Sequence, residues 1–285
     1  MSAVTATVAG RQRSRLAVLG SPIGHSRSPL LHAAAYRALG LDWTYERHEV
    51  GEGGLAAFLA GLDETWRGLS LTMPLKPEAA RLAGRLSDVA EETGAVNTLL
   101  LGGATDGDDI AGYNTDVYGI LRALRDQGVE TADRVLVLGA GATARSVVSA
   151  ARRLGARTVV AAARRSEAAE DLAGYARRLE LAAETAGLAD PLPAGADLVV
   201  NTIPGGVAGR LAFCDPLTRS PLLEIAYDPW PSPLASRWAG PVVSGLDMLL
   251  HQAVAQVRIF VTGDPHEPLP AEAGILAAMR AALAA

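Results

Sequence analysis

The sequence predicts an α/β protein with two lobes. Short apolar stretches with the length of strands alternate with helical patterns along most of the chain, which is typical of sheets built from βαβ units. The chain has 285 residues, and single hydrophobic cores rarely grow beyond about 250 residues. A glycine-rich turn follows the apolar stretch 134–138 and opens a helix, as in a Rossmann-type dinucleotide-binding lobe. We therefore expect an N-terminal α/β lobe, completed by C-terminal helices, and a Rossmann-type lobe.

The composition is that of a folded protein and argues against several kinds of partner. Hydrophobic residues make up 49% of the chain and charged residues 20%, enough for a packed core. The net charge of -5 and the scattered basic residues argue against a nucleic-acid surface. No apolar run reaches the roughly 18 residues of a membrane span, and the first residues lack a signal-peptide pattern, so we expect a soluble, cytoplasmic protein. One cysteine, Cys214, and five dispersed histidines predict neither a disulfide nor a metal site.

The first lobe is expected to follow a flexible lead-in over residues 1–14. A loop rich in Gly, Ser and Pro contains Ser28 and Pro29, a good N-cap and N1 pair for a helix. Capping alone would account for Ser28, but it does not require a second hydroxyl at Ser26. The patterns predict strands at 15–19 and 43–48 and helices at 29–39, 55–62 and 87–92.

Three polar residues of this lobe each allow a functional and a structural interpretation. The stretch 68–76 reads as a buried strand, a turn at Pro74 and Lys76 at a helix start, where a lysine is usually just solvated. Asn97 interrupts an apolar stretch, and because a buried amide must be hydrogen-bonded, it either ties down a neighbouring loop or faces a ligand. Asp116 opens a helix to about residue 125, where the helix dipole favours a carboxylate in any case.

The glycine-rich turn predicts a dinucleotide site. Gly139 permits a tight turn, Gly141 lets a pyrophosphate approach the backbone, and Ala144 keeps the helix close to the strand. The whole run is Gly139, Ala140, Gly141, Ala142, Thr143 and Ala144.

The next strand, 157–162, bears on the choice of cofactor. An NAD site usually has an acidic residue at this strand end for the ribose 2′-hydroxyl, whereas here Arg164 and Arg165 offer guanidinium groups for a 2′-phosphate. The sequence therefore predicts NADP, although exposed arginines are also common at helix starts.

Later polar residues could line the nicotinamide side of the same lobe. Asn201 and Thr202 end the apolar strand 197–201, where they serve either a ligand or the loop alone. Gln252 could simply occupy the polar face of its helix. The remaining elements are strands at 222–226 and 242–243, a rigid turn at 227–233, an amphipathic helix at 246–254, and a last helix at 271–284 that packs back on the first lobe.

Taken together, the order and spacing of these motifs resemble the shikimate dehydrogenase family along nearly the whole chain. The matching motifs are Ser26-Arg27-Ser28-Pro29, Thr72-x-Pro74-x-Lys76, Ala95-Val96-Asn97-Thr98, Gly112-Tyr113-Asn114-Thr115-Asp116, the glycine loop, Asn201-Thr202-x-Pro204, Tyr227-Asp228-Pro229 and Gly245-Leu246-x-Met248-Leu249-x-x-Gln252.

The resemblance implies the NADPH-dependent, reversible reduction of 3-dehydroshikimate to shikimate in aromatic amino-acid (chorismate) biosynthesis. It implies a substrate-binding lobe, 1–115 with 246–285, and an NADP-binding lobe, 116–245. We expect a small-molecule substrate, no nucleic-acid or membrane partner, and a monomer or homodimer. The implied catalytic pair is Lys76 and Asp116; the implied substrate-binding residues are Ser26, Ser28, Thr72, Asn97, Tyr227 and Gln252; the implied cofactor-binding residues are the glycine loop, Arg164, Arg165, Asn201, Thr202, Gly245 and Met248.

One departure and two alternatives stay open at this point. The family usually has Asn where this chain has Ser70, and a hydroxyl cannot donate and accept as an amide does, so that contact with substrate is in doubt. The first alternative is a quinate or quinate/shikimate dehydrogenase that uses NAD. The second is a non-catalytic metabolite-sensing protein on the same scaffold, which could dispense with Lys76 or Asp116.

Overall fold

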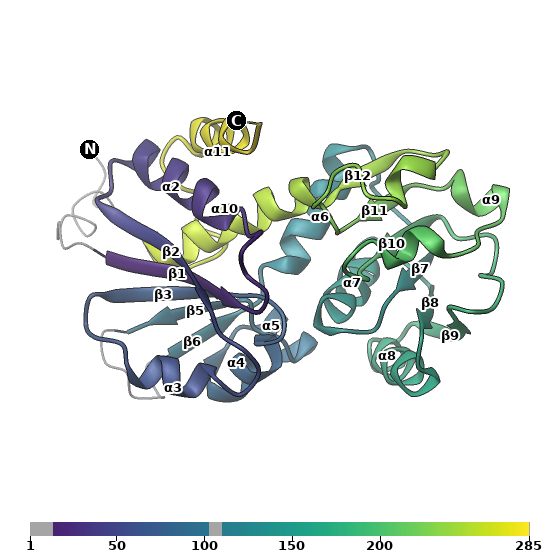
Figure 1. Cartoon of the computed structure of the whole chain (residues 1–285), viewed down its shortest axis with the longest axis horizontal. Helices are drawn as coiled ribbons and strands as arrows, with labels where there is room; N and C mark the ends of the chain where they lie inside the picture. The colour runs from purple at the N-terminus through teal and green to yellow at the C-terminus, as the bar shows by residue number, and fades with distance from the viewer. Residues whose placement is uncertain (1–13, 103–109, 285) are drawn as a thin grey trace. The chain divides into compact units, whose positions relative to one another are not determined.

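The computed structural model describes residues 14–102 and 110–284 and divides into two compact units. The first unit comprises residues 1–115 and 252–285, and the second comprises residues 116–251. Each unit has its own six-stranded sheet, which confirms the prediction of a two-lobed α/β protein (Figure 1). Apart from Ser14, the expected lead-in lies outside the described residues, as does the Gly- and Asp-rich turn before Ile110.

The first unit is built on a mixed sheet with the strand order β2-β1-β3-β5-β6-β4. Strands β1 and β3 run parallel, whereas β5 runs antiparallel to β3 and to β6. The elements are β1 (Ser14–Gly20), α2 (Ser28–Leu39), β2 (Trp43–Glu49), α3 (Leu55–Ala60), β3 (Trp66–Leu71), α4 (Lys76–Leu82), β4 (Arg85–Leu86), α5 (Asp88–Thr93), β5 (Thr98–Leu101), β6 (Ile110–Tyr113) and α11 (Glu272–Ala284). Helix α10 (Gly245–Thr262) starts in the second unit and ends in this one.

Strand β3 shows how the sequence separates the two faces of this sheet. Leu69 and Leu71 join a core cluster with residues of α3, α4 and α5. Because side chains alternate along a strand, Gly68 and Ser70 turn to the opposite face. A Cβ at Gly68 would lie 2.5 Å from the ring of Phe260 in α10, so this close approach of helix and strand requires glycine.

Helix α10 differs from the amphipathic helix that the sequence predicts. It extends to Thr262, and every residue from 250 to 260 is buried. The reason lies in its neighbours within the first unit: β3, α2 and α11 all contact it, through Ser70, His32 and Glu272. Over residues 250–260 this helix therefore has no solvent-exposed face. The prediction of an amphipathic helix was wrong.

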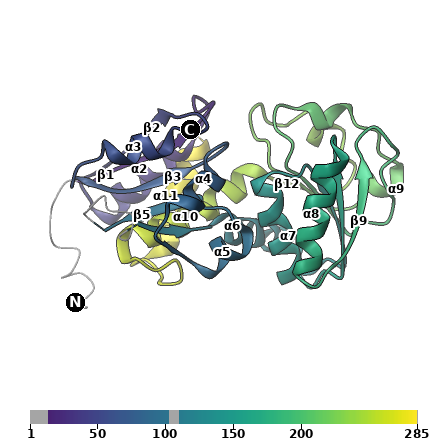
Figure 2. The same ribbon diagram turned by 90° about the horizontal axis from the view of Figure 1, so that it is seen from below.

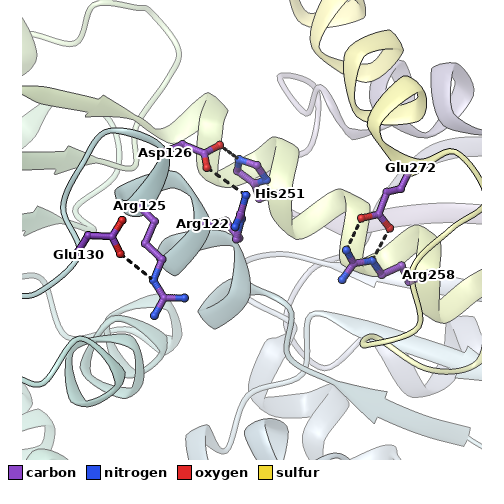
Figure 3. A network of polar contacts seen from close by, with 7 residues as sticks. All are labelled: Arg122, Arg125, Asp126, Glu130, His251, Arg258 and Glu272. Carbon is purple, nitrogen blue, oxygen red and sulfur yellow. Dashed lines mark hydrogen bonds and ion pairs between the residues drawn. The ribbon is translucent and has the colours of Figure 1, made fainter.

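The last helix packs back on the first unit, as expected. Figure 1 shows α11 alongside α2, and Arg27 donates a hydrogen bond to the carbonyl of Leu283 at 3.0 Å. Arg258 of α10 forms a bidentate ion pair with Glu272 of α11, with N–O distances of 2.7 and 2.5 Å (Figure 3). This pair is largely shielded from water and fixes α11 on α10.

The second unit contains a fully parallel sheet with the strand order β12-β11-β10-β7-β8-β9. The order reverses between β7 and β10, and open α/β sheets bind ligands at the carboxyl ends of the strands at such a point. The elements are α6 (Asp116–Asp126), β7 (Arg134–Leu138), α7 (Ala142–Arg153), β8 (Thr158–Ala163), α8 (Ser166–Arg178), β9 (Ala182–Gly187), β10 (Leu198–Asn201), α9 (Asp215–Thr218), β11 (Leu222–Glu224) and β12 (Val242–Ser244).

Helices and loops cover both faces of this second sheet. Helices α7 and α8 lie next to each other along one face (Figure 2). The other face packs against the segment 208–238, which includes Leu217 and Trp238. The beginning of α10 is held to α6 by Asp126, which accepts hydrogen bonds from Arg122 at 3.2 Å and pairs with His251 at 2.8 Å (Figure 3). Among the described residues, no helix has the length and apolar character of a membrane span.

Candidate active site

The polar residues singled out in the first unit gather at one edge of its sheet. Ser26 and Ser28 follow β1, Thr72 and Lys76 follow β3, and Asn97 precedes β5. Since β5 is antiparallel to β3, its amino end lies at the carboxyl end of β3. Two backbone hydrogen bonds join these segments, from Thr72 N–H to the Leu19 carbonyl at 2.9 Å and from Val96 N–H to the Lys76 carbonyl at 3.1 Å. Residues that are far apart in the sequence therefore meet at this edge.

Asn97 is buried and ties neighbouring segments together, as one of its two interpretations predicts. Its side-chain oxygen accepts hydrogen bonds from the Thr115 N–H and the Thr98 hydroxyl, both at 2.9 Å. Its amide nitrogen donates to the Thr115 hydroxyl at 2.9 Å and to Gln252 at 3.4 Å. The same amide thus fixes the start of β5, the segment after β6 and helix α10.

Gln252 is itself buried, with 7% of its surface exposed, rather than lying on a solvated helix face. One turn further along α10, Gln256 extends the same polar network. Its amide nitrogen donates to the Asn97 carbonyl at 3.1 Å and to the Thr98 hydroxyl at 3.0 Å. Its side-chain oxygen accepts a hydrogen bond from Ser70 at 3.0 Å. Two glutamines of α10 therefore hold the segment around Asn97.

Ser28 does not act as the predicted N-cap. It is already the first residue of α2, while Arg27 takes the cap position with helical backbone angles and no side-chain cap. The Ser26 hydroxyl accepts a hydrogen bond from the Ser28 N–H at 3.4 Å. The helix starts one residue earlier than expected because the Arg27 carbonyl already accepts from Leu30 and Leu31. The Ser28 side chain is consequently not used for capping.

Lys76 and Asp116 each open a helix and are both buried, with 8% and 4% of their surface exposed. Lysine and aspartate are almost never fully buried without a partner. The interpretation of Lys76 as a solvated surface charge is therefore wrong. Lys76 belongs to the first unit and Asp116 begins the second, so their pairing stays a prediction.

In the second unit, the glycine loop follows β7 at the point where the strand order reverses. Gly139 has φ +99°, and a Cβ there would lie 2.4 Å from the Thr202 hydroxyl, so only glycine fits. Apart from Gly141 itself and its chain neighbours, no atom of the described residues lies within 4 Å of the position of a Cβ at Gly141, and no side chain caps α7 there. Ala144 is fully buried against the strands. The loop therefore has the open backbone and the free helix start that a pyrophosphate requires.

Arg164 and Arg165 are both exposed directly after β8, the strand next to β7. Arg165 precedes the first residue of α8. This is the strand end where a Rossmann lobe binds the 2′ position of the adenosine ribose. The two guanidinium groups are thus suitably placed for a 2′-phosphate.

Asn201 and Thr202 make internal hydrogen bonds at the end of β10. Thr202 donates to the Leu138 carbonyl at 2.8 Å and so fixes the glycine loop. Asn201 donates to Glu224 at 2.7 Å. Glu224 is fully buried at the end of β11, and its carboxyl group also accepts from the Ala226 N–H and the Ser232 hydroxyl, both at 3.0 Å. Burial raises the pKa of Glu224, against the opposing effect of these three hydrogen bonds.

Three other predicted residues lie near this end of the second sheet. Tyr227 is in the turn after β11 and therefore belongs to the second unit, unlike the other predicted substrate-binding residues. Gly245 begins α10, and a Cβ there would lie 2.1 Å from the Ile225 carbonyl oxygen. Met248 follows in the first turn of α10 and is buried.

Comparison with known proteins establishes the family. The family model for the shikimate dehydrogenase substrate binding domain matches residues 18–99. The shikimate dehydrogenase (NADP(+)) of Geobacter metallireducens is 35% identical over 267 residues, which cover 88% of this chain and 92% of that protein. The chain belongs to the shikimate dehydrogenase family.

Solved structures of shikimate dehydrogenases share this fold. The Mycobacterium tuberculosis shikimate dehydrogenase is 40% identical with a TM-score of 0.79, covering 95% of this chain and 99% of that one. A Thermus thermophilus shikimate 5-dehydrogenase, solved in complex with NADP(H) and shikimate, is 32% identical with a TM-score of 0.76, covering 94% of this chain and 99% of that one.

Several residues of the two hydrogen-bond networks were not singled out from the sequence. Gln256 follows Gln252 by four residues, so one helical face carries both, and this spacing was an available signal. Glu224 is an acid that ends an apolar strand. His32 and Tyr45 gave no signal, because only the folded chain brings them to Ser70 and Gln256.

Proposed function

We propose that the chain is an NADP-dependent shikimate dehydrogenase that reversibly reduces 3-dehydroshikimate to shikimate. One observation carries most weight: Lys76 is the only lysine of the sequence, and it is buried at the sheet edge where the polar residues gather. All the other basic side chains apart from histidine are arginines, which do not give up a proton in proteins. An amine at this one position indicates a need for proton transfer.

The proposed chemistry assigns the proton and the charge to residues of this chain. NADPH, when bound, supplies the hydride. Reduction of a ketone builds negative charge on its oxygen, which the Lys76 ammonium stabilises and protonates. Asp116 orients the amine and shares the proton path. Ser26 and Ser28 bind the substrate carboxylate, and Thr72, Asn97 and Gln252 bind the ring hydroxyls, with Tyr227 as a further substrate contact.

The proposed cofactor site lies in the second unit. The glycine loop Gly139–Ala144 would hold the pyrophosphate and Arg164, ahead of Arg165, the 2′-phosphate. Asn201, Thr202, Gly245 and Met248 would line the nicotinamide side. These assignments correspond to an NADP-binding lobe over about 116–245 and a substrate-binding lobe over 1–115 and 246–285. A cytoplasmic location, a monomer or homodimer, and a place in chorismate biosynthesis stay predictions.

The alternative from a different class, a metabolite-sensing protein, is tested by Lys76→Ala. We expect kcat for 3-dehydroshikimate to fall about 100-fold or more, the range for loss of an acid group. NADPH affinity, measured by fluorescence titration, should stay unchanged because Lys76 belongs to the unit that lacks the glycine loop. Lys76→Arg keeps the charge but not the transferable proton, and it should also be slow.

Arg81→Ala is the matched control, because Arg81 is on the same helix α4 and, within the part of the chain that the structure describes, bonds only to the Pro77 carbonyl, at 3.3 Å. Its kcat should equal that of the wild type. A wild-type protein that binds shikimate and NADPH without turnover would favour the sensor, and an unchanged kcat in Lys76→Ala would remove Lys76 from the mechanism.

A further inference from the structure

A carboxyl group is buried at the carboxyl end of the second sheet, and the proposed reaction does not use it. It belongs to Glu224, the last residue of β11, which is fully buried. Burial opposes its charged form and so raises the pKa of Glu224. Within the described part of the chain, its hydrogen-bond partners are all neutral groups, so no cation offsets this cost. An apolar residue would continue the strand after Leu222 and Leu223 without the cost, which indicates that the acid has a role besides packing.

Three hydrogen-bond donors face this carboxyl group, one from the end of β10 and two from the loop after β11. The Asn201 amide nitrogen donates to Oε1 at 2.7 Å, and the Ala226 N–H donates to the same oxygen at 3.0 Å. The Ser232 hydroxyl donates to Oε2 at 3.0 Å. The Asn201 side-chain oxygen accepts from the Ile203 N–H at 3.1 Å, so the amide nitrogen is the atom that turns towards Glu224. All of these groups belong to the second unit.

These contacts lie at the end of the sheet where an open α/β sheet binds its ligand. Glu224 and Asn201 are paired in register as the last residues of two neighbouring parallel strands. The loop after β11 contains Tyr227, and Glu224 bonds to this loop on both sides of that residue, at Ala226 and at Ser232. One buried carboxyl group therefore joins the loop of Tyr227 to the strand that ends in Asn201.

We propose that Glu224 is a positioning residue, which places the nicotinamide ring for hydride transfer by holding Asn201 and the loop of Tyr227 together. This proposal rests on the proposed function, in which Asn201 lines the nicotinamide side and Tyr227 contacts the substrate. A displacement of about 1 Å at the reacting groups can lower a rate by about 100-fold, so the effect should appear in kcat. The adenosine half of the cofactor, bound by the glycine loop and Arg164, should not depend on Glu224.

The test measures two quantities on each variant. The first is kcat for the oxidation of shikimate by NADP+, and the second is the binding of 2′,5′-ADP, which contains the adenosine half of NADP but no nicotinamide. Glu224→Ala leaves three donors unsatisfied, so kcat should fall about tenfold or more while 2′,5′-ADP binds as it does to the wild type. Ser232→Ala removes one of the three bonds and should cause a smaller loss of kcat. Glu224→Gln keeps an acceptor for Asn201 and Ala226, so it should retain most of the wild-type kcat.

Ser220→Ala is the matched control for Ser232→Ala. The Ser220 hydroxyl donates to the Ala196 carbonyl at 2.6 Å, and so it joins the segments before β11 and β10, at the opposite ends of the same two strands. Each substitution removes one hydrogen bond of a serine hydroxyl, so both should lower the melting temperature. Only Ser232→Ala should lower kcat.

Several results would overturn the role of Glu224. They are an unchanged kcat in Ser232→Ala, equal losses of kcat in Ser232→Ala and Ser220→Ala, or a kcat of Glu224→Gln far below that of the wild type. Weaker binding of 2′,5′-ADP to Ser232→Ala would also overturn it, because the whole unit would then be disturbed. If Glu224→Ala does not fold, Ser232→Ala and its control decide. A wild type that binds 2′,5′-ADP but does not oxidise shikimate would instead refute the proposed function itself.

Discussion

At the scale of single residues, burial changes what the polar side chains of the first unit can do. His32 is the clearest case, because it is fully buried between Tyr36, Tyr45 and Gln256. Burial lowers the pKa of His32 to about 3, against the smaller raising effect of its hydrogen bond with Gln256. The imidazole is therefore neutral at physiological pH.

This burial predicts a pH dependence of stability. Unfolded His32 takes up a proton below about pH 6.5, whereas the folded form stays neutral down to about pH 3. The free energy of unfolding should therefore fall as the pH is lowered from 6.5 towards 3, by up to about 1.4 kcal/mol per pH unit from this site. The measurement is urea denaturation at several pH values, with His32→Gln as the comparison.

Glutamine keeps a donor towards Gln256 but does not titrate. The difference in stability between wild type and His32→Gln should shrink as the pH falls below 6.5. Parallel curves for the two proteins would contradict the assignment of a neutral, buried imidazole.

At the scale of elements, local sequence predicted most strands and helices. It did not predict which other elements pack against them. Strand 134–138 and the run from β3 into α4 were expected where they occur, because apolar stretches, glycine and proline act over a few residues. Strand β9 was not expected, because this edge strand is mostly polar or small and partly exposed. The burial of α10 could not be predicted, since its neighbours α2, β3 and α11 come from distant parts of the chain.

The attachment of α11 to α10 provides a prediction at this scale. Arg258→Ala leaves the Glu272 carboxylate without its bidentate partner in a largely buried position. We expect the free energy of unfolding of the first unit to fall by about 2–3 kcal/mol, below the range for a fully buried pair because Glu272 is partly exposed. Urea denaturation monitored by circular dichroism measures the change.

The exposed pair Arg152 and Glu180, 3.5 Å apart, supplies the control. Arg152→Ala should change stability by less than about 0.5 kcal/mol. Equal effects of the two arginine substitutions would show that α11 is not held by its ion pair.

At the scale of the whole molecule, the sequence indicates candidate site residues in both units, but it does not predict the contacts that surround them. Both sets follow strand ends, where motifs can be read in the chain, as with Thr72 and Lys76 after β3 or the glycine loop after β7. The contacts that hold Asn97 could not be predicted in the same way. They join residues as distant as Asn97 and Gln256, 159 positions apart, and a local pattern contains no such information.

The choice of cofactor and substrate is the central claim for the molecule as a whole. Its most direct test is to measure kcat/KM for shikimate and for quinate, each with NADP+ and with NAD+ at equal concentration. The measurement is made on the wild type and on Arg164→Ala. Shikimate with NADP+ should be the preferred pair, and Arg164→Ala should weaken the preference for NADP+ while leaving that for shikimate intact. Strong NAD-linked oxidation of quinate by the wild type would contradict the account.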